Sequence, residues 1–188
     1  SGGSQVSWVN RFDDPKSSDD GEYRHRLINQ ITLSALTRQL KRQRDLLPAS
    51  VGNVVARKSD IGRTTVAFGL FADTLPGEHS KALDTLIRER DRLIRFGVSD
   101  RDVENLKADI REAALKMKAR PEKREFSDWV QMLAIAWQNR QTYLPAQTRA
   151  DRALSELDSI TAADINTRLR SWLQAPDQVV QFLSLIHI

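Results

Sequence analysis

The sequence predicts an α+β fold, a two-layer lobe in which a mostly antiparallel sheet of about four strands carries helices on one face. Strand-like segments stand near both ends of the chain and as a pair after the first helix, whereas the long middle part has helical apolar spacing. Runs of helices beside a small sheet are typical of two-layer α+β domains. With 188 residues, 40% of them hydrophobic, the chain is large enough for one buried core.

We expect a single lobe over residues 5–188. Residues 1–4, SGGS, resemble a vector-derived scar and are excluded from the fold prediction. The sequence contains neither a run of 18 apolar residues nor a signal peptide, so we expect no membrane span. The absence of cysteine excludes disulfides and thiolate metal sites and is compatible with any compartment.

The first predicted elements are a strand and a long helix. Residues 5–12 read as a strand because Val6 and Trp8 alternate with polar residues. Residues 13–21 form a polar loop, and the helix follows over residues 22–44. Its apolar positions recur every three or four residues: Leu27, Ile31, Ala35 or Leu36, and Leu40.

A β-hairpin and a second helix come next. Residues 49–58 and 63–73 are rich in β-branched side chains, and Gly62 supplies backbone freedom in the turn between them. Residues 77–96 then predict an amphipathic helix that follows a Pro-Gly turn.

The joint after this helix is the most specific local signal in the chain. Gly97 suits a left-handed helix stop because it has no Cβ to clash. Ser99 is placed as the N-cap of the next helix, residues 100–118, with Asp102 three positions later as in a capping box. We therefore expect a rigid, specified joint rather than a mobile linker.

A further helix is predicted over residues 124–139. We expect five of its large side chains to face inward: Phe126, Trp129, Val130, Leu133 and Trp137. Trp129 and Trp137 are eight residues apart, and core packing explains them better than a ligand platform.

The last part of the chain returns to the sheet. A short helix is predicted over residues 149–157, and a second capping box, Thr161 to Asp164, opens a helix that ends near residue 173. Residues 178–188 (QVVQFLSLIHI) are strand-like and too apolar to remain in water, so we expect them to join the sheet.

The charge pattern does not favour nucleic-acid binding. The chain carries 29 basic and 25 acidic residues, dispersed rather than in a block. Residues 38–44 (RQLKRQR) are the strongest basic run, and the solvated, cationic end of a helix explains them better than a nucleic-acid patch. The glycines do not form a phosphate-binding motif.

Four acidic residues in the first loop raise the question of calcium. Asp13, Asp14, Asp19 and Asp20 do not follow the EF-hand spacing. Asp19 or Asp20 could instead cap the helix that follows, which is a common role for aspartate. We therefore favour a helix-capping loop over a metal site.

Four segments together resemble the pitrilysin/insulinase family of zinc metallopeptidases. They are residues 36–53, the hairpin with its following helix, residues 96–110, and residues 160–182 with their I-T-x-x-D-[IV] phrase. The KSDIG and DWVQ segments resemble bacterial PqqL-type zinc proteases. The resemblance covers nearly the whole chain and implies one lobe of a clamshell built from repeated lobes.

The same resemblance implies a lobe without catalytic residues. Active lobes of the family carry H-x-x-E-H, but His25, His79 and His187 all stand outside this pattern. A second family motif, L-R-x-x-x-x-L-x-Y, aligns with LKRQRDLLP, which places Lys41 at the arginine position and Pro48 at the tyrosine position. We therefore expect no catalytic, cofactor-binding or metal residues in this segment, and zinc only in the parent enzyme.

By resemblance, we expect a non-catalytic structural lobe of a bacterial zinc metalloendopeptidase, a hydrolase that encloses peptide substrates in a clamshell chamber. Its partners would be the other lobes of the polypeptide and the parent's peptide substrate, without nucleic acid. The resemblance implies a periplasmic location. The alternative is an autonomous, non-enzymatic binding or assembly subunit of the same fold. The apolar end of the chain, FLSLIHI, also predicts weak self-association through the terminal strand or an inter-lobe face.

Overall fold

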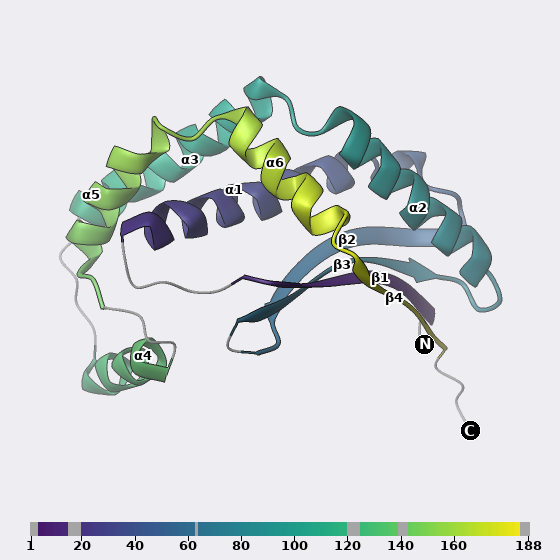
Figure 1. Ribbon diagram of the computed structural model, residues 1–188, viewed down its shortest axis with the longest axis horizontal. Coiled ribbons are helices and arrows are strands. Elements are labelled where there is room, and N and C mark those ends of the chain that lie inside the picture. Colours follow the sequence, from purple (N-terminus) through teal and green to yellow (C-terminus); the bar gives the residue numbers. More distant parts are fainter. Residues whose placement is uncertain (1–3, 15–19, 63, 120–124, 139–142, 185–188) are drawn as a thin grey trace.

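Four strands form one open antiparallel sheet in the order β2-β3-β1-β4, which confirms the predicted fold class. The computed structural model describes residues 4–14, 20–62, 64–119, 125–138 and 143–184. The strands are β1 (Ser4–Asp13), β2 (Val51–Asp60), β3 (Thr65–Thr74) and β4 (Asp177–Leu183). The first three lie within two residues of the expected ranges. The central strand β1 pairs with both β3 and β4 (Figure 1).

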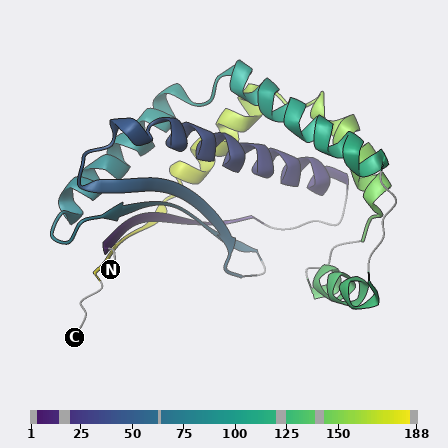
Figure 2. The ribbon, with the colours of Figure 1, turned by 180° about the vertical axis from the view of Figure 1, so that it is seen from behind.

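Helices cover one face of this sheet. The α-helices of the described part are α1 (Asp20–Arg42), α2 (His79–Phe96), α3 (Asp100–Ala119), α4 (Phe126–Gln138), α5 (Ala146–Leu157) and α6 (Ala162–Leu173). Helices α1, α2 and α6 pack on the strands, while α3 and α5 pack on each other and on α1. Figures 1 and 2 show that the opposite face of the sheet carries none of the described helices.

The core lies between the sheet and the helices that cover it. Trp172 of α6 is fully buried, with its ring centroid 5.1 Å from that of Phe68 and 6.5 Å from that of Phe12. The apolar positions predicted for the first helix are all buried: Leu27, Ile31, Ala35, Leu36 and Leu40. The sequence left open whether Ala35 or Leu36 faces the core. Both do, because the two adjacent positions lie in the same buried stripe.

The joint between α2 and α3 has the predicted glycine at positive φ and the predicted Ser99 cap, but the ψ of Gly97 lies outside the left-handed helical region. Of the expected capping box, the described structure has only the bond from the Asp102 N–H to Ser99. Gly97 adopts φ +64° and ψ −150°, and its N–H donates to the carbonyl oxygen of Leu93 at 2.9 Å. The Ser99 hydroxyl oxygen accepts the N–H of Asp102 at 3.2 Å, as expected of an N-cap residue. Its O–H also donates to the Asp102 carboxylate at 3.0 Å.

A side chain from α6 locks this joint. The Asn166 amide accepts the N–H of Val98 at 2.7 Å and donates to the carbonyl oxygen of Val98 at 3.0 Å. A Cβ at Gly97 would stand 2.3 Å from the Asn166 side-chain oxygen, which is closer than atoms approach without displacement. The joint therefore needs glycine both for its backbone conformation and for space.

The predicted orientation of α4 was wrong. We expected its large apolar side chains to face the core, yet none of its residues is buried. Phe126 and Trp137 are each 82% exposed, and Val130 and Leu133 are about half exposed. Only Trp129 is partly covered, with its ring edge-to-face on Tyr143 at 5.4 Å. The helical period identified the apolar stripe correctly, but the described residues of this lobe do not cover it.

The last strand joins the sheet as expected, but it is not buried. Trp8 pairs with Val180 in the β1–β4 register, and all seven residues of β4 are exposed. Residues 185–188 of the predicted strand lie outside the described residues. Since β4 ends the strand order, one side of its backbone is an open sheet edge within the described structure.

Candidate functional site

Asp14, directly after β1, is a buried carboxylate surrounded by basic and polar side chains. Its Oδ1 lies 2.6 Å from Nε2 of His25, and its Oδ2 lies 3.3 Å from the side-chain nitrogen of Asn29. Lys58 Nζ stands 3.4 Å from Oδ2, and an Arg168 nitrogen stands 3.9 Å from Oδ1. The Asp14 carboxylate therefore joins four elements: the end of β1, the helices α1 and α6, and the strand β2.

The hydrogen bonds assign the protons in this cluster. An Arg168 Nη lies 2.8 Å from Nδ1 of His25, and a guanidinium can only donate. Nδ1 therefore accepts, and Nε2–H donates to Asp14. Burial alone would raise the pKa of Asp14, but the His25 hydrogen bond and the positive charges of Lys58 and Arg168 together hold this pKa below its usual value. The cluster is an ion-pair centre that holds β1, β2, α1 and α6 together, and the side-chain oxygen of Asn29 is its one buried atom without a partner in the described structure.

The sequence predicted the roles of the acidic residues in the first loop only in part. Asp13 accepts a 3.4 Å hydrogen bond from the Thr65 hydroxyl, and Asp14 belongs to the centre above rather than to a cap. Asp19 and the Asp20 side chain lie outside the described part of the chain, so the capping prediction stays open. Across the described ranges, no group of three or more His, Asp or Glu side chains could hold a metal ion.

The two histidines of the described residues, His25 and His79, contact different parts of the lobe. His25 is engaged by Asp14 and Arg168. His79 is half-buried at the start of α2, with its ring 6.1 Å from that of Phe182. His187 lies outside the described residues.

The two positions aligned with the family's second motif show structural roles. Lys41 is an exposed residue in the last turn of α1, which ends two residues earlier than predicted. A 3₁₀ turn, Arg44–Leu46, follows, and the Pro48 carbonyl oxygen accepts the Val51 N–H at 2.8 Å, at the start of β2. Proline and lysine here complete a helix end and a strand start.

Two members of the basic run 38–44 are paired with carboxylates of α3. Arg38 contacts Asp109, and an Arg42 nitrogen lies 2.7 Å from Asp102. The Arg42 hydrogen bond is the largest influence that lowers the pKa of Asp102. The run therefore forms a helix–helix contact, in keeping with the interpretation as a solvated helix face.

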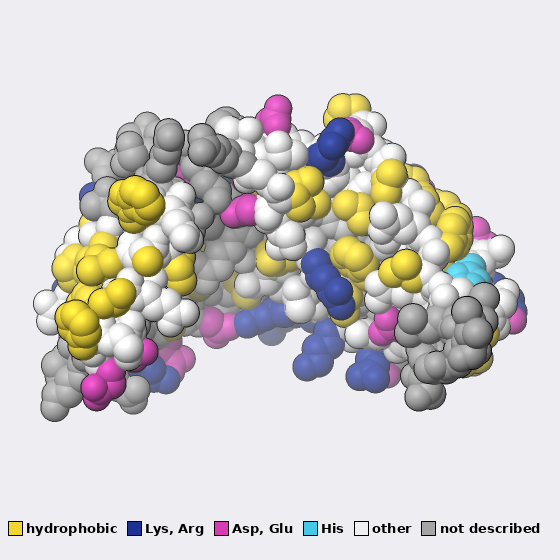
Figure 3. All heavy atoms as spheres, turned by 90° about the horizontal axis from the view of Figure 1, so that it is seen from below, with side chains coloured by type: hydrophobic (Ala, Val, Ile, Leu, Met, Phe, Trp, Pro, Cys, Tyr) yellow, Lys and Arg dark blue, Asp and Glu magenta, His cyan; other side chains and the backbone are white. Residues whose placement is uncertain are grey.

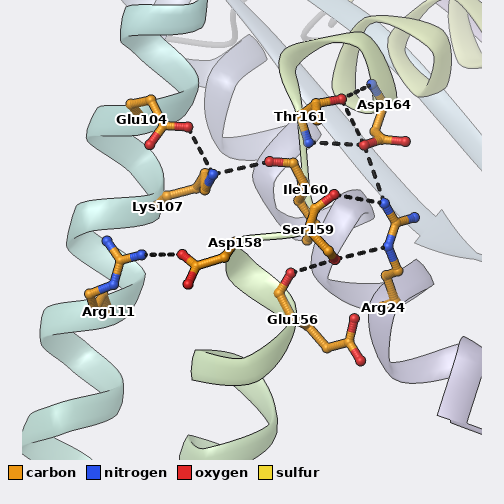
Figure 4. A network of polar contacts seen from close by, with 10 residues as sticks. All are labelled: Arg24, Glu104, Lys107, Arg111, Glu156, Asp158, Ser159, Ile160, Thr161 and Asp164. Carbon is orange, nitrogen blue, oxygen red and sulfur yellow. Dashed lines mark hydrogen bonds and ion pairs between the residues drawn. The ribbon is translucent and has the colours of Figure 1, made fainter.

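The turn between α5 and α6 is held from two sides (Figure 4). From α1, Arg24 donates to the Ser159 carbonyl oxygen and to the Asp164 carboxylate, both at 3.2 Å. From α3, the buried Lys107 donates to the Ile160 carbonyl oxygen at 3.1 Å. The predicted capping box from Thr161 to Asp164 is present with both of its hydrogen bonds.

Two apolar surfaces remain exposed (Figure 3). Seen from below, one group of apolar side chains covers α4 on the left, and another lies around the sheet edge on the right, with a hollow between them. A pocket of about 360 Å³ separates α4 from α1, lined by residues that include Leu27, Met132, Ile135 and Tyr143. None of the described helices is long and apolar enough to cross a membrane.

Several residues of these centres carry no sequence signal that would have found them. Lys58 and Arg168 reach Asp14 from positions 44 and 154 residues later in the chain (58 − 14 and 168 − 14). Asn166 and Lys107 likewise act through contacts far along the chain. Pattern reasoning covers only neighbouring positions, and such pairs are created by the tertiary fold.

Comparison with known proteins gives structural matches only. No protein-family model and no curated protein matches the sequence. The ferredoxin protease FusC, solved in complex with Arabidopsis ferredoxin, is 46% identical to this chain with a TM-score of 0.88. That match covers 97% of this chain and 20% of the FusC chain.

Two more distant structures share the fold. The periplasmic protease PqqL from Escherichia coli is 11% identical, with a TM-score of 0.85 over 98% of this chain and 20% of its own. The inactive peptidase domain of an inferred zinc protease from Bordetella parapertussis is 15% identical, with a TM-score of 0.61 over 97% of this chain and 93% of its own. This chain therefore spans about a fifth of the FusC and PqqL chains.

Proposed function

Since this chain has the fold of one lobe of the pitrilysin/insulinase-type proteases, we propose that it is a non-catalytic lobe of a longer bacterial zinc metalloendopeptidase. The observation that carries the proposal is the match to FusC, 46% identical over 97% of this chain. The relative described as an inactive peptidase domain supports the non-catalytic role. Lys41 and Pro48 support it as well, because lysine lacks the bidentate guanidinium and proline has no side-chain donor.

Zinc would be held elsewhere in the longer polypeptide. A catalytic zinc site needs three converging protein ligands and an open position. His25 already hydrogen-bonds Asp14 and Arg168, and His79 packs on Phe182 without a neighbouring ligand in the described structure. The described residues of this lobe therefore do not fit the metal, and the H-x-x-E-H helix would belong to another lobe.

The lobe would form part of the wall of a chamber that encloses the substrate. Enclosure excludes large folded proteins and favours peptides or small unfolded chains. FusC was solved with ferredoxin, so we propose a small ferredoxin-type protein as one substrate of the longer enzyme. The periplasmic relative PqqL supports the same compartment for this protein.

The isolated 188-residue chain is expected to be inert towards unfolded peptides and ferredoxin, with or without added zinc. The longer polypeptide that contains it is expected to cleave them in a chelator-sensitive reaction. Peptide cleavage followed by mass spectrometry measures both, and elemental analysis counts the zinc. Chelator-sensitive cleavage or stoichiometric zinc in the isolated chain would contradict a non-catalytic lobe. An inactive longer polypeptide would contradict the enzyme assignment.

A second candidate function is an autonomous, non-enzymatic binding or assembly subunit. The Bordetella relative favours it, because that solved chain, of which this chain covers 93%, holds one inactive peptidase domain of similar size. The two functions differ in the longer polypeptide: the first requires a lobe with H-x-x-E-H, and the second does not.

We also expect weak self-association of the isolated chain through β4. The edge strand has no charged side chain from Gln178 to Leu183, and exposed, uncharged edges pair readily with another strand. Sedimentation between micromolar and millimolar concentration should show reversible growth in mass. Val180→Lys should abolish it, and Gln131→Lys on α4 serves as the control. Equal association of both variants, or a strict monomer, would exclude the strand as the contact.

A further inference from the structure

The outward face of α4 carries a continuous apolar stripe. At 3.6 residues per turn, its four large side chains fall within about 60° of the helix circumference and span about 16 Å of its length. The members of this stripe are Phe126, Val130, Leu133 and Trp137. Asp128, the acidic residue of the helix, lies on a different side, so the stripe itself is uncharged.

The inward side of α4 is accounted for by this lobe. Trp129 packs edge-to-face on Tyr143, and Met132 and Ile135 line the pocket shared with α1. The stripe lies on the neighbouring side of the helix, about 100° around its circumference, and its two rings are each 82% exposed. Aromatic side chains present roughly 150–250 Å² each, so the two rings alone expose about 300 Å² of apolar surface. A patch of this size is comparable to the largest apolar patch on a typical soluble monomer, and such patches are often functional.

The apolar area of the stripe indicates which kind of partner can bind to it. A stable complex between free proteins buries about 800 Å² on each partner, which this stripe does not reach. A neighbour joined by the same polypeptide chain has an effective concentration of order millimolar, so a small apolar contact suffices to hold it. An extended substrate would gain only side-chain contacts, because the backbone groups of a helix are already hydrogen-bonded.

We propose that this stripe is the docking surface for another lobe of the same longer polypeptide, which presents an uncharged apolar face to it. The match to FusC, which covers 97% of this chain but 20% of that relative, is consistent with such a neighbour. The inference rests on the proposed function only in requiring the lobe to be part of a longer chain.

Cysteine labelling tests the inference, because this lobe contains no cysteine of its own. Trp137→Cys probes the stripe, and Gln131→Cys, exposed on another side of α4, is the matched control. Both are placed in the longer polypeptide, with its other cysteines replaced, and in the 188-residue chain. We expect a maleimide to react at least 10-fold more slowly at position 137 than at position 131 in the longer polypeptide, and at similar rates in the short chain.

Other results would overturn the inference. Equal rates at both positions in the longer polypeptide would leave the stripe without a docked lobe. Protection that appears only with ferredoxin would make the substrate the occupant, and protection that grows with protein concentration would make it a second copy. Phe126→Cys provides an independent probe if Trp137→Cys perturbs α4. The cleavage assay separates the two proposals, since protection at position 137 without proteolysis would retain the docking surface and reject the enzyme.

Discussion

Replacing Gly97 with alanine is expected to destabilise the lobe by about 3–4 kcal/mol. A non-glycine residue at positive φ costs roughly 1–2 kcal/mol. In addition, the new Cβ would stand 2.3 Å from the Asn166 side-chain oxygen, so Asn166 would have to withdraw from Val98. Each of its two lost hydrogen bonds contributes about 0.5–1.5 kcal/mol. Urea unfolding followed by circular dichroism measures the loss.

Gly77 is the matched control for this substitution. It also has positive φ, +82°, but a Cβ there would meet nothing within 4 Å. Gly77→Ala should therefore cost only the backbone term, about 1–2 kcal/mol. In an Asn166→Ala background, Gly97→Ala should fall to the same value, because the clash is gone. Equal losses at the two glycines in the parent sequence would show that the contact with Asn166 does not constrain the joint.

Replacing Asp14 with asparagine is expected to cost about 3 kcal/mol at neutral pH. The substitution leaves Arg168 partly buried without the Asp14 carboxylate and leaves Lys58 only its 3.9 Å contact with the half-exposed Asp60. Removing one partner of a buried ion pair typically costs about 3–5 kcal/mol. Water can partly solvate the charges of Lys58 and Arg168, so we expect a loss of stability at the lower end of this range. The same measurement on Asp91→Asn, a carboxylate 63% exposed and paired with Arg90, should change stability by less than about 0.5 kcal/mol.

The stability should also depend on pH in a defined direction. The pKa of Asp14 is lower in the folded chain than in the unfolded chain, so the folded state binds fewer protons. The stabilisation by Asp14 is complete above the unfolded pKa, about 3.9, and is lost as pH falls through the folded pKa. Asp14→Asn should flatten this acid limb of the curve. An unchanged limb would mean that other carboxylates produce it.

Local sequence signals predicted those features whose partners lie within one helical turn. The Ser99 cap and the box from Thr161 to Asp164 are of this kind, because each joins residues three positions apart. The hydrogen bonds between Asn166 and Val98 join residues 68 positions apart, so no local sequence pattern could predict them. The candidate centres of this lobe are mostly of the second kind, and for this reason they were not predicted.

The α4 prediction shows a different limit of sequence reasoning. Periodicity identifies which side chains share a face, and Phe126, Val130, Leu133 and Trp137 do share one. It does not specify whether the covering surface comes from the same lobe. Strand β4 is similar: its apolar residues predicted a place in the sheet, and the strand lies at the open edge. In both cases hydrophobicity predicted contact but not the contacting partner.

The pairing of β1 with β4 has a consequence for synthesis on the ribosome. Gln5 and Leu183 are opposite each other in the register, although they leave the ribosome 178 residues apart (183 − 5). At about 5–20 residues per second, β1 waits on the order of 10–30 s for its neighbour. During that interval the hairpin β2–β3 and the helices can assemble around β1, while its second edge stays unpaired. This nascent stage is where we expect chaperone binding and misassembly to concentrate.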